Sequence, residues 1–114
     1  PVSEKDIQTE IYPDTGFTRR MLNSTGATIS AGRFVNRTGA KTIALANGSD
    51  DVYGFVYRDI LNGKTGNVVT IKKIHTAYLN SAGSNGKFGI TNGVVDYANT
   101  TYKGFVIDGI TTLY

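Results

Sequence analysis

The 114-residue chain has no cysteine and no tryptophan, and it has only one histidine, one methionine and two prolines. The lack of cysteine excludes disulfide bonds, thiolate nucleophiles and cysteine-ligated zinc sites. Because His75 is the one histidine, a serine-histidine-aspartate triad has a single possible base. A metal site with two or three histidine ligands would need several subunits. Composition alone therefore disfavours the common hydrolytic and metal-dependent chemistries.

Long apolar runs are also lacking. No segment approaches the roughly 20 apolar residues of a membrane-spanning helix, and no basic-then-apolar leader opens the sequence. The sequence begins with proline, as expected when an initiator methionine is removed before a small residue, so we expect cytosolic synthesis without export. We predict no membrane partner, and the length fits one domain of about 100–150 residues.

Charge is weakly basic overall but unevenly distributed. The formal net charge is +3 and the isoelectric point is near 9.2, which is modest for a dedicated nucleic-acid-binding protein. Residues 1–14 hold four acidic side chains and one lysine, whereas residues 15–48 hold five basic side chains and no acidic one. This separation favours an assembly in which the acidic end of one molecule contacts the basic stretch of its neighbour. The alternative is that these residues are ordinary solvated surface charges.

Fourteen glycines separate short apolar runs, which is typical of an all-β protein with many short strands. Expected turns lie at the Asn-Gly pairs 47–48, 62–63, 85–86 and 92–93, because both residue types tolerate positive φ. Runs rich in Val, Ile, Thr, Tyr and Phe predict strands at 27–29, 33–36, 42–46, 53–57, 67–73, 76–78, 87–90, 94–97 and 102–107. The spacing predicts a small β-barrel or β-sandwich over residues 24–114 as a single domain.

Two of these segments resemble each other. Gly54-Phe55-Val56 and Gly104-Phe105-Val106 are each followed shortly by an aspartate and an isoleucine. We predict that both are central strands, in which glycine allows close backbone approach and phenylalanine fills the core.

Residues 1–23 have no sustained helical or strand period, and we predict that they form an extended N-terminal arm outside the β domain. The alternative is an N-terminal strand and loop folded onto their own domain. The arm's apolar and basic side chains are the candidate contacts to a capsid or to a neighbouring subunit: Ile7, Ile11, Tyr12, Phe17, Arg19, Arg20 and Met21.

No constellation of residues predicts catalysis or cofactor binding. Asp50, Asp51 and Asp59 form the one local carboxylate cluster a glycosidase could use, but adjacent aspartates more often cap a turn. The loop 83–87 lacks phosphate-loop spacing, and His75 lies at an expected strand end with no partner nearby in sequence. Lys72, Lys73 and tyrosines 53, 57, 78, 97 and 102 could bind single-stranded nucleic acid. Strand alternation instead directs most of these rings to the core.

The order of segments resembles a known family. The segments are, in order, Gly26-Ala27-Thr28-Ile29-Ser30-Ala31-Gly32-Arg33-Phe34-Val35, then Thr38-Gly39-Ala40-Lys41-Thr42-Ile43-Ala44-Leu45-Ala46, then Val52-Tyr53-Gly54-Phe55-Val56-Tyr57-Arg58-Asp59-Ile60, and finally Gly66-Asn67-Val68-Val69-Thr70-Ile71. This order is similar to that of the small capsid decoration, or cement, proteins of tailed bacteriophages. The resemblance covers residues 26–74, and residues 104–110 more loosely.

The resemblance implies a non-enzymatic β-rich protein on the outer surface of a phage head, synthesised in the bacterial host cytoplasm. Its implied partners are the major capsid protein and itself, as a homotrimer, and it implies no catalytic residue. A head-fibre or receptor- and glycan-binding module is the alternative, which a run of exposed aromatics in residues 78–102 would favour. A nucleic-acid-binding role ranks below both, and an enzyme ranks last.

Overall fold

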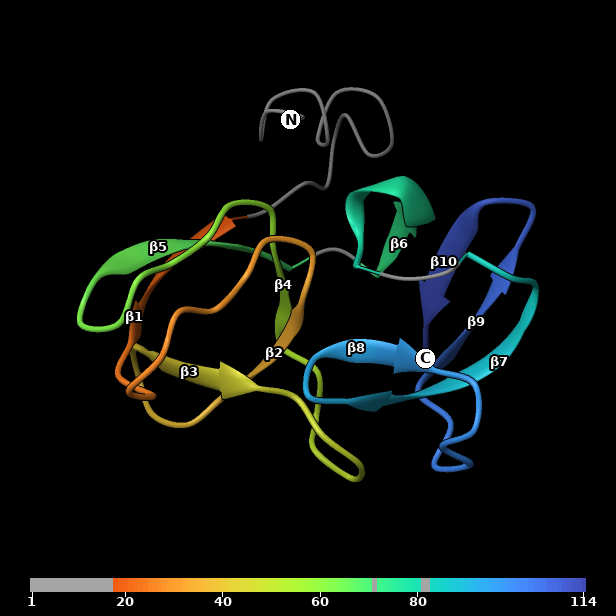
Figure 1. The fold of residues 1–114 in the computed structure, drawn as a ribbon, viewed down its shortest axis with the longest axis horizontal. Coiled ribbons are helices and arrows are strands. Elements are labelled where there is room, and N and C mark those ends of the chain that lie inside the picture. The colour runs from red at the N-terminus through yellow and green to blue at the C-terminus, as the bar shows by residue number, and fades with distance from the viewer. Residues whose placement is uncertain (1–17, 71, 81–82) are drawn as a thin grey trace.

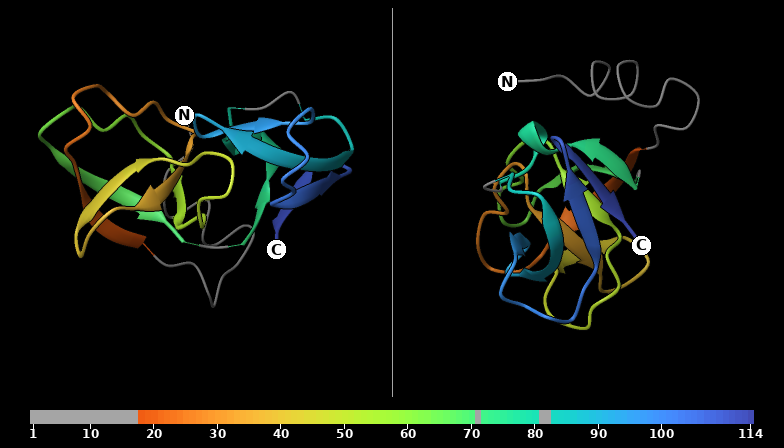
Figure 2. Two further views of the ribbon diagram at one scale, coloured as in Figure 1. Left: turned by 90° about the horizontal axis from the view of Figure 1, so that it is seen from below. Right: turned by 90° about the vertical axis from the view of Figure 1, so that its right-hand side faces the viewer.

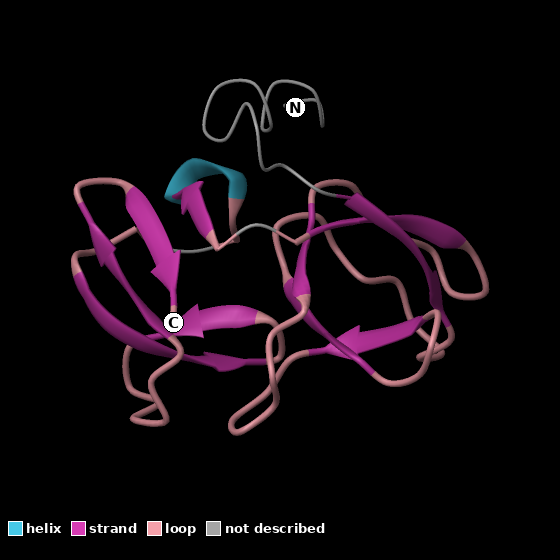
Figure 3. Cartoon of the chain, turned by 180° about the vertical axis from the view of Figure 1, so that it is seen from behind, coloured by secondary structure: helices cyan, strands magenta, loops and turns pink. Residues whose placement is uncertain are grey.

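The structure is a computed structural model that describes residues 18–70, 72–80 and 83–114. In these residues the fold is all-β, as predicted, and the one helix is a short 3-10 turn, η1 (Thr76–Tyr78). A closed barrel and a five-stranded sheet lie side by side (Figure 1), and the same two parts are seen in Figure 2. Viewed from behind, short strands joined by loops make up nearly all of both parts (Figure 3).

Five strands close the barrel in the order β1-β3-β2-β4-β5. They are β1 (Thr18–Asn23), β2 (Phe34–Arg37), β3 (Thr42–Leu45), β4 (Gly54–Val56) and β5 (Thr65–Val69). Closure depends on β1, which pairs in parallel with β3 and antiparallel with β5. The interior is filled by Met21, Ile29, Val35, Ile43, Val56, Ile60 and Val68, each 3% exposed or less. A closed barrel has no unpaired edge strand.

The second sheet has the order β6-β10-β9-β7-β8. Its strands are β6 (Lys73–His75), β7 (Gly86–Thr91), β8 (Val94–Asp96), β9 (Gly104–Ile107) and β10 (Ile110–Leu113). The predicted Asn92-Gly93 turn joins β7 to β8, and both residues have positive φ, 50° and 76°. These values are those of the two-residue turns that suit the twist of a β-hairpin.

The barrel and the second sheet share a buried core. Phe34 and Phe55 from the barrel belong to the same apolar cluster as Phe88 and Val106 from the sheet. All four side chains are at most 1% exposed. The barrel and the second sheet are therefore joined by buried apolar side chains, whose removal from water stabilises the contact.

The barrel begins earlier than predicted. Residues 18–23, assigned to the arm from the sequence, form β1, and Met21 is buried in the barrel interior. The Asn23 side chain is fully buried, and its Nδ2 donates to the carbonyls of Ala27 and Ile60, each at 2.8 Å. The predicted boundary at residue 23 was therefore wrong, because β1 supplies both pairing and core. Residues 1–17 of the predicted arm lie outside the described residues.

Several other strand predictions differ from the structure. Residues 76–78 turn as η1, because the Leu79 N–H donates back to the Thr76 carbonyl at 3.0 Å. The expected strand 27–29 reduces to a single bridge between Ile29 and Ile60. The expected strand 67–73 corresponds to β5, which ends at Val69, and β6, which begins at Lys73. Strand β10 was not predicted at all.

The two Gly-Phe-Val segments are central strands, as predicted, since β4 lies between β2 and β5 and β9 lies between β10 and β7. A Cβ on Gly54 would overlap the Val69 carbonyl oxygen, and one on Gly104 would overlap the Thr112 carbonyl oxygen. At both positions, only a glycine therefore allows the neighbouring strand to approach so closely. The prediction for phenylalanine holds in β4 alone, because Phe105 is half-buried and its ring lies against Tyr114.

A buried hydroxyl pair offers a test of packing in the second sheet. The Oγ1 atoms of Thr76 and Thr111 are 2.8 Å apart, and the residues are 5% and 0% exposed. Replacing Thr111 with valine should lower the free energy of unfolding by about 1–3 kcal/mol, because one hydroxyl loses its partner. Replacing both threonines with valine should recover most of that loss, as measured by urea denaturation. Additive losses in the double variant would show that the pair is not coupled.

Candidate functional site

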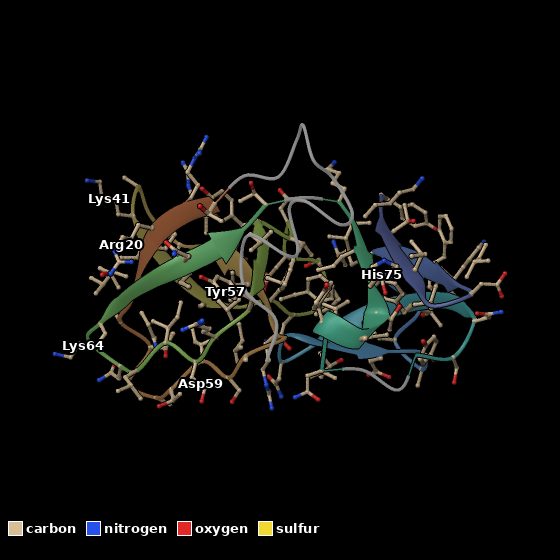
Figure 4. All side chains as sticks on the ribbon, turned by 90° about the horizontal axis from the view of Figure 1, so that it is seen from above. Arg20, Lys41, Tyr57, Asp59, Lys64 and His75 are labelled. Atoms are coloured by element: carbon tan, nitrogen blue, oxygen red, sulfur yellow. The ribbon has the colours of Figure 1, made fainter. Side chains whose placement is uncertain are left out.

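Four exposed basic side chains lie on β1 and next to it. Arg19 and Arg20 lie on β1, and Lys41 and Lys64 lie in the flanking loops; together they are called the β1 basic face. Backbone pairing places both lysines beside the end of β1, because the Leu22 N–H donates to the Lys41 carbonyl at 2.7 Å and the Asn23 N–H donates to the Lys64 carbonyl at 2.9 Å. Arg20, Lys41 and Lys64 lie at the end of the barrel remote from the second sheet (Figure 4).

This face collects positive charge at a solvent-exposed surface. All four side chains are exposed, and the sequence from residue 15 to 48 contains no acidic residue. Four like charges on adjoining backbone segments favour an acidic partner surface and disfavour a basic one.

The predicted contact residues divide into three groups. Arg19 and Arg20 are exposed on β1. Met21 is 3% exposed and belongs to the barrel core, so its assignment as a contact residue was wrong. The remaining candidates lie outside the described residues: Ile7, Ile11, Tyr12 and Phe17.

A second candidate surface is a groove between the barrel and the second sheet, with a cavity volume of about 420 Å³. It is called the inter-sheet groove and is lined by Asp51, Val52, Tyr53, Thr70, Lys72, Tyr102, Lys103, Leu113 and Tyr114. The sequence indicates Tyr53, Tyr102 and Lys72 as one candidate group and Asp51 as part of the carboxylate cluster, but it does not indicate the other five lining residues. The nine residues come from separate segments of the chain, so no local motif marks them.

Two of the three aspartates of the carboxylate cluster accept hydrogen bonds from the backbone. Asp50 Oδ2 accepts the Asn47 N–H at 2.9 Å, and the Asp50 N–H donates to the Asn47 carbonyl at 2.7 Å, so this aspartate closes a turn as expected. Asp59 Oδ1 accepts the Ala31 N–H at 2.7 Å and ties two barrel loops together. Both side chains have structural partners that account for their positions.

The other sequence candidates also have structural partners. His75 ends β6, and its ring meets the edge of Tyr78 at 6.2 Å between centroids. Asn85, in the glycine-rich loop, has an Oδ1 that accepts the Asp108 N–H at 2.9 Å and so joins two hairpin ends. Within the described ranges, no three His, Asp or Glu side chains are grouped so that they could hold a metal ion.

Most tyrosines pack against the protein interior, as predicted. Tyr57, Tyr78 and Tyr97 are partly buried against the shared core, and the Tyr97 hydroxyl donates to the Ser84 carbonyl. The run of exposed aromatics in residues 78–102 that would favour a head-fibre or glycan-binding module is not present in the described part of that segment, where Tyr102 is the one exposed aromatic. The exposed rings Tyr102 and Tyr114 instead meet at the inter-sheet groove.

In the described part of the chain, no helix has the length and apolar character needed to cross a membrane. Comparison of the chain with protein-family models, with curated proteins and with solved structures finds no match.

Proposed function

We propose that this chain is a non-enzymatic capsid decoration protein that binds the outer surface of a phage head and stabilises contacts between major capsid subunits. The observation that carries the proposal is the β1 basic face, an exposed group of four cations on a closed barrel. Such a face suits a broad acidic protein surface, because complementary charge steers association and fixes orientation.

The sequence resemblance to capsid decoration proteins also supports the proposal, and the two stretches that carry it lie together in the fold. The Gly32 N–H donates to the Val56 carbonyl at 2.6 Å, and the Val56 N–H donates to the Arg33 carbonyl at 3.0 Å. The two stretches that carry the resemblance, residues 26–35 and 52–60, are therefore hydrogen-bonded to each other. They form part of the scaffold that presents β1 at the surface.

Charge also supports self-association as part of this function. Residues 1–14 carry a side-chain net charge of −3, counting four acidic residues and one lysine. The β1 basic face offers the opposite charge on a neighbouring copy, which fits a homotrimer on the head. Weak contacts repeated over a trimer or a lattice give strong overall binding. The proposal includes neither a nucleic-acid partner nor a membrane partner.

Reversing the charge of the β1 basic face should weaken binding to heads. In the double variant Arg19→Glu/Arg20→Glu, we expect the affinity for expanded, emptied heads to fall by about tenfold or more, because two attractive contacts become repulsive. Co-sedimentation with heads measures the change. The unmodified protein should also bind less tightly as salt rises, because exposed charges are screened.

The matched control is Lys73→Glu/Lys87→Glu, which makes the same change in net charge at two exposed lysines of the second sheet. This variant should bind heads within about twofold of the unmodified protein, because distant exposed charges are screened. Equal losses in both double variants would show that total charge and not the β1 basic face governs binding. If the protein binds free capsid subunits as tightly as heads, or binds neither, the proposed function is wrong.

A further inference from the structure

The inter-sheet groove has the size and stability of a ligand site. Its volume of about 420 Å³ lies in the range of small-molecule sites, about 300–1,000 Å³. The backbone beneath it is hydrogen-bonded: the Leu113 N–H donates to the Lys72 carbonyl at 2.7 Å, and the Tyr114 N–H donates to the Lys103 carbonyl at 2.9 Å. The paired backbone fixes the positions from which these side chains extend, so mainly their own rotamers must be ordered when a ligand binds.

Aromatic rings form much of the lining. Tyr102 is 44% exposed and Tyr114 is 62% exposed, while Tyr53 is half-buried. The Phe105 ring lies 6.2 Å from the Tyr114 ring, centroid to centroid, and supports it from the sheet. A tyrosine offers both a flat apolar face and a hydroxyl. Such rings suit a ligand with apolar C–H faces and a rim of hydroxyl groups, which is the surface of a sugar ring.

The charge around these rings is positive. Lys72 and Lys103 line the groove. Lys87 Nζ lies 5.6 Å from the Tyr102 ring centroid, and Arg37 Cζ lies 5.8 Å from the Tyr53 ring centroid. Among the described residues that line the groove, Asp51 is the one with an acidic side chain. The excess of cations around a concave surface favours an anionic ligand.

Of the charged side chains that line the groove, Lys103 and Asp51 are available to a ligand, whereas Lys72 already has a partner. Lys72 Nζ donates to the Tyr114 main-chain oxygen at 3.3 Å, so this lysine is already placed. Lys103 and Asp51, by contrast, have no side-chain partner among the residues that the structure describes. An ammonium and a carboxylate in one groove offer a donor for an anion and an acceptor for hydroxyl hydrogens.

The presence of Asp51 distinguishes between anionic ligands. A carboxylate in the lining repels a phosphate backbone, but it accepts hydrogen bonds from the hydroxyls of a sugar. A ligand that carries both hydroxyls and a carboxylate satisfies Asp51 and Lys103 together. Nucleic acid can also contact the lysines and the rings, and its bases carry N–H donors for a carboxylate, so what disfavours it here is the repulsion between Asp51 and the phosphates.

We propose that the inter-sheet groove binds an acidic saccharide. Lys103 contacts the carboxylate of the sugar, Asp51 accepts its hydroxyls, and Tyr102 and Tyr114 pack against its ring faces. This inference is independent of the capsid proposal, because the groove and the β1 basic face have no residue in common. On a virion, such a site would allow contact with acidic polysaccharide at a cell surface.

The test is a titration of the full chain followed by NMR, with sialyllactose and trigalacturonic acid as the acidic probes. Lactose is the matched neutral probe for sialyllactose, and a thymidine hexanucleotide tests the nucleic-acid outcome. We expect at least one acidic probe to shift the backbone amides of Lys103 and Tyr114. Lactose should bind about tenfold more weakly than sialyllactose if the latter binds, because it lacks the charged contact.

Two variants in the lining and one control variant outside it test whether the acidic probe binds in the inter-sheet groove. Lys103→Gln and Tyr102→Ala should each weaken the acidic probe by about fivefold to tenfold, with the amide spectrum elsewhere unchanged. Lys73→Gln removes the same charge from an exposed position outside the lining and should leave affinity unchanged. The proposal is overturned if neither acidic probe binds, if the Lys103 and Lys73 variants lose affinity equally, or if the hexanucleotide binds as tightly as the acidic sugars.

Discussion

A chain that lacks residues 1–22 is expected to lose the barrel, whereas a chain that lacks residues 1–17 is expected to keep it. Strand β1 is hydrogen-bonded on both sides, and its pairing with β5 runs from Thr18 to Leu22. Removing it opens the barrel at β3 and β5 and takes Met21 out of the core. The loss approaches the whole stability of a small domain, about 5–15 kcal/mol. Circular dichroism with thermal unfolding measures the difference.

Comparing the two truncations separates a role in folding from a role in binding. If the 1–22 deletion still unfolds cooperatively at the same temperature, β1 is not essential to the barrel. If the 1–17 deletion folds but no longer binds heads, Ile7, Ile11, Tyr12 and Phe17 remain candidate contacts. If it binds heads as the full chain does, these four side chains have no part in attachment.

The fold class could be predicted because its causes are local. The glycine of every Asn-Gly pair has positive φ, and in Asn92-Gly93 the asparagine has it too, at 50° and 76°. Asp108-Gly109 has the same chemistry, with φ of 49° and 80°, and it joins β9 to β10. Strand β10 could therefore have been predicted from its turn, since an Asp-Gly pair between two apolar runs is also a hairpin signal.

Strand β1 is hidden in the sequence by a polar core residue. Its buried positions are Met21 and Asn23, and a buried asparagine does not register in a pattern of apolar alternation. The Asn23 amide is satisfied by the carbonyl of Ile60, 37 residues away in the chain. A partner at that separation is not deducible from spacing, so the segment was interpreted as an arm.

The candidate sites were only partly predictable for the same reason. Arg19 and Arg20 could be selected because they are consecutive charges, but Lys41 and Lys64 join them only through strand pairing. The inter-sheet groove depends on long-range bonds such as that from the Leu113 N–H to the Lys72 carbonyl, which connects residues 41 positions apart. Local sequence patterns do not show which distant segments of the chain will be hydrogen-bonded to each other.

Replacing Phe55 with alanine is expected to unfold the barrel and the second sheet together. The Phe55 side chain is 1% exposed and belongs to the cluster that also contains Phe88 and Val106 of the sheet. Loss of a buried phenylalanine lowers the free energy of unfolding by about 3–5 kcal/mol, from lost burial and from the cavity left behind. Because this cluster is common to both parts, amide exchange should accelerate equally at Val68 in β5 and at Val106 in β9.

The matched control is Ile107→Ala, on β9, whose side chain is 55% exposed. This change should alter stability by no more than about 0.5 kcal/mol and should leave exchange at both amides unchanged. If Phe55→Ala accelerates exchange at Val68 alone, the barrel and the second sheet unfold as separate units. The inter-sheet groove would then lie between two independently stable parts, and its geometry would depend on their docking. If both amides accelerate together, the groove is part of one cooperative fold, and a ligand bound there stabilises the barrel as well as the sheet.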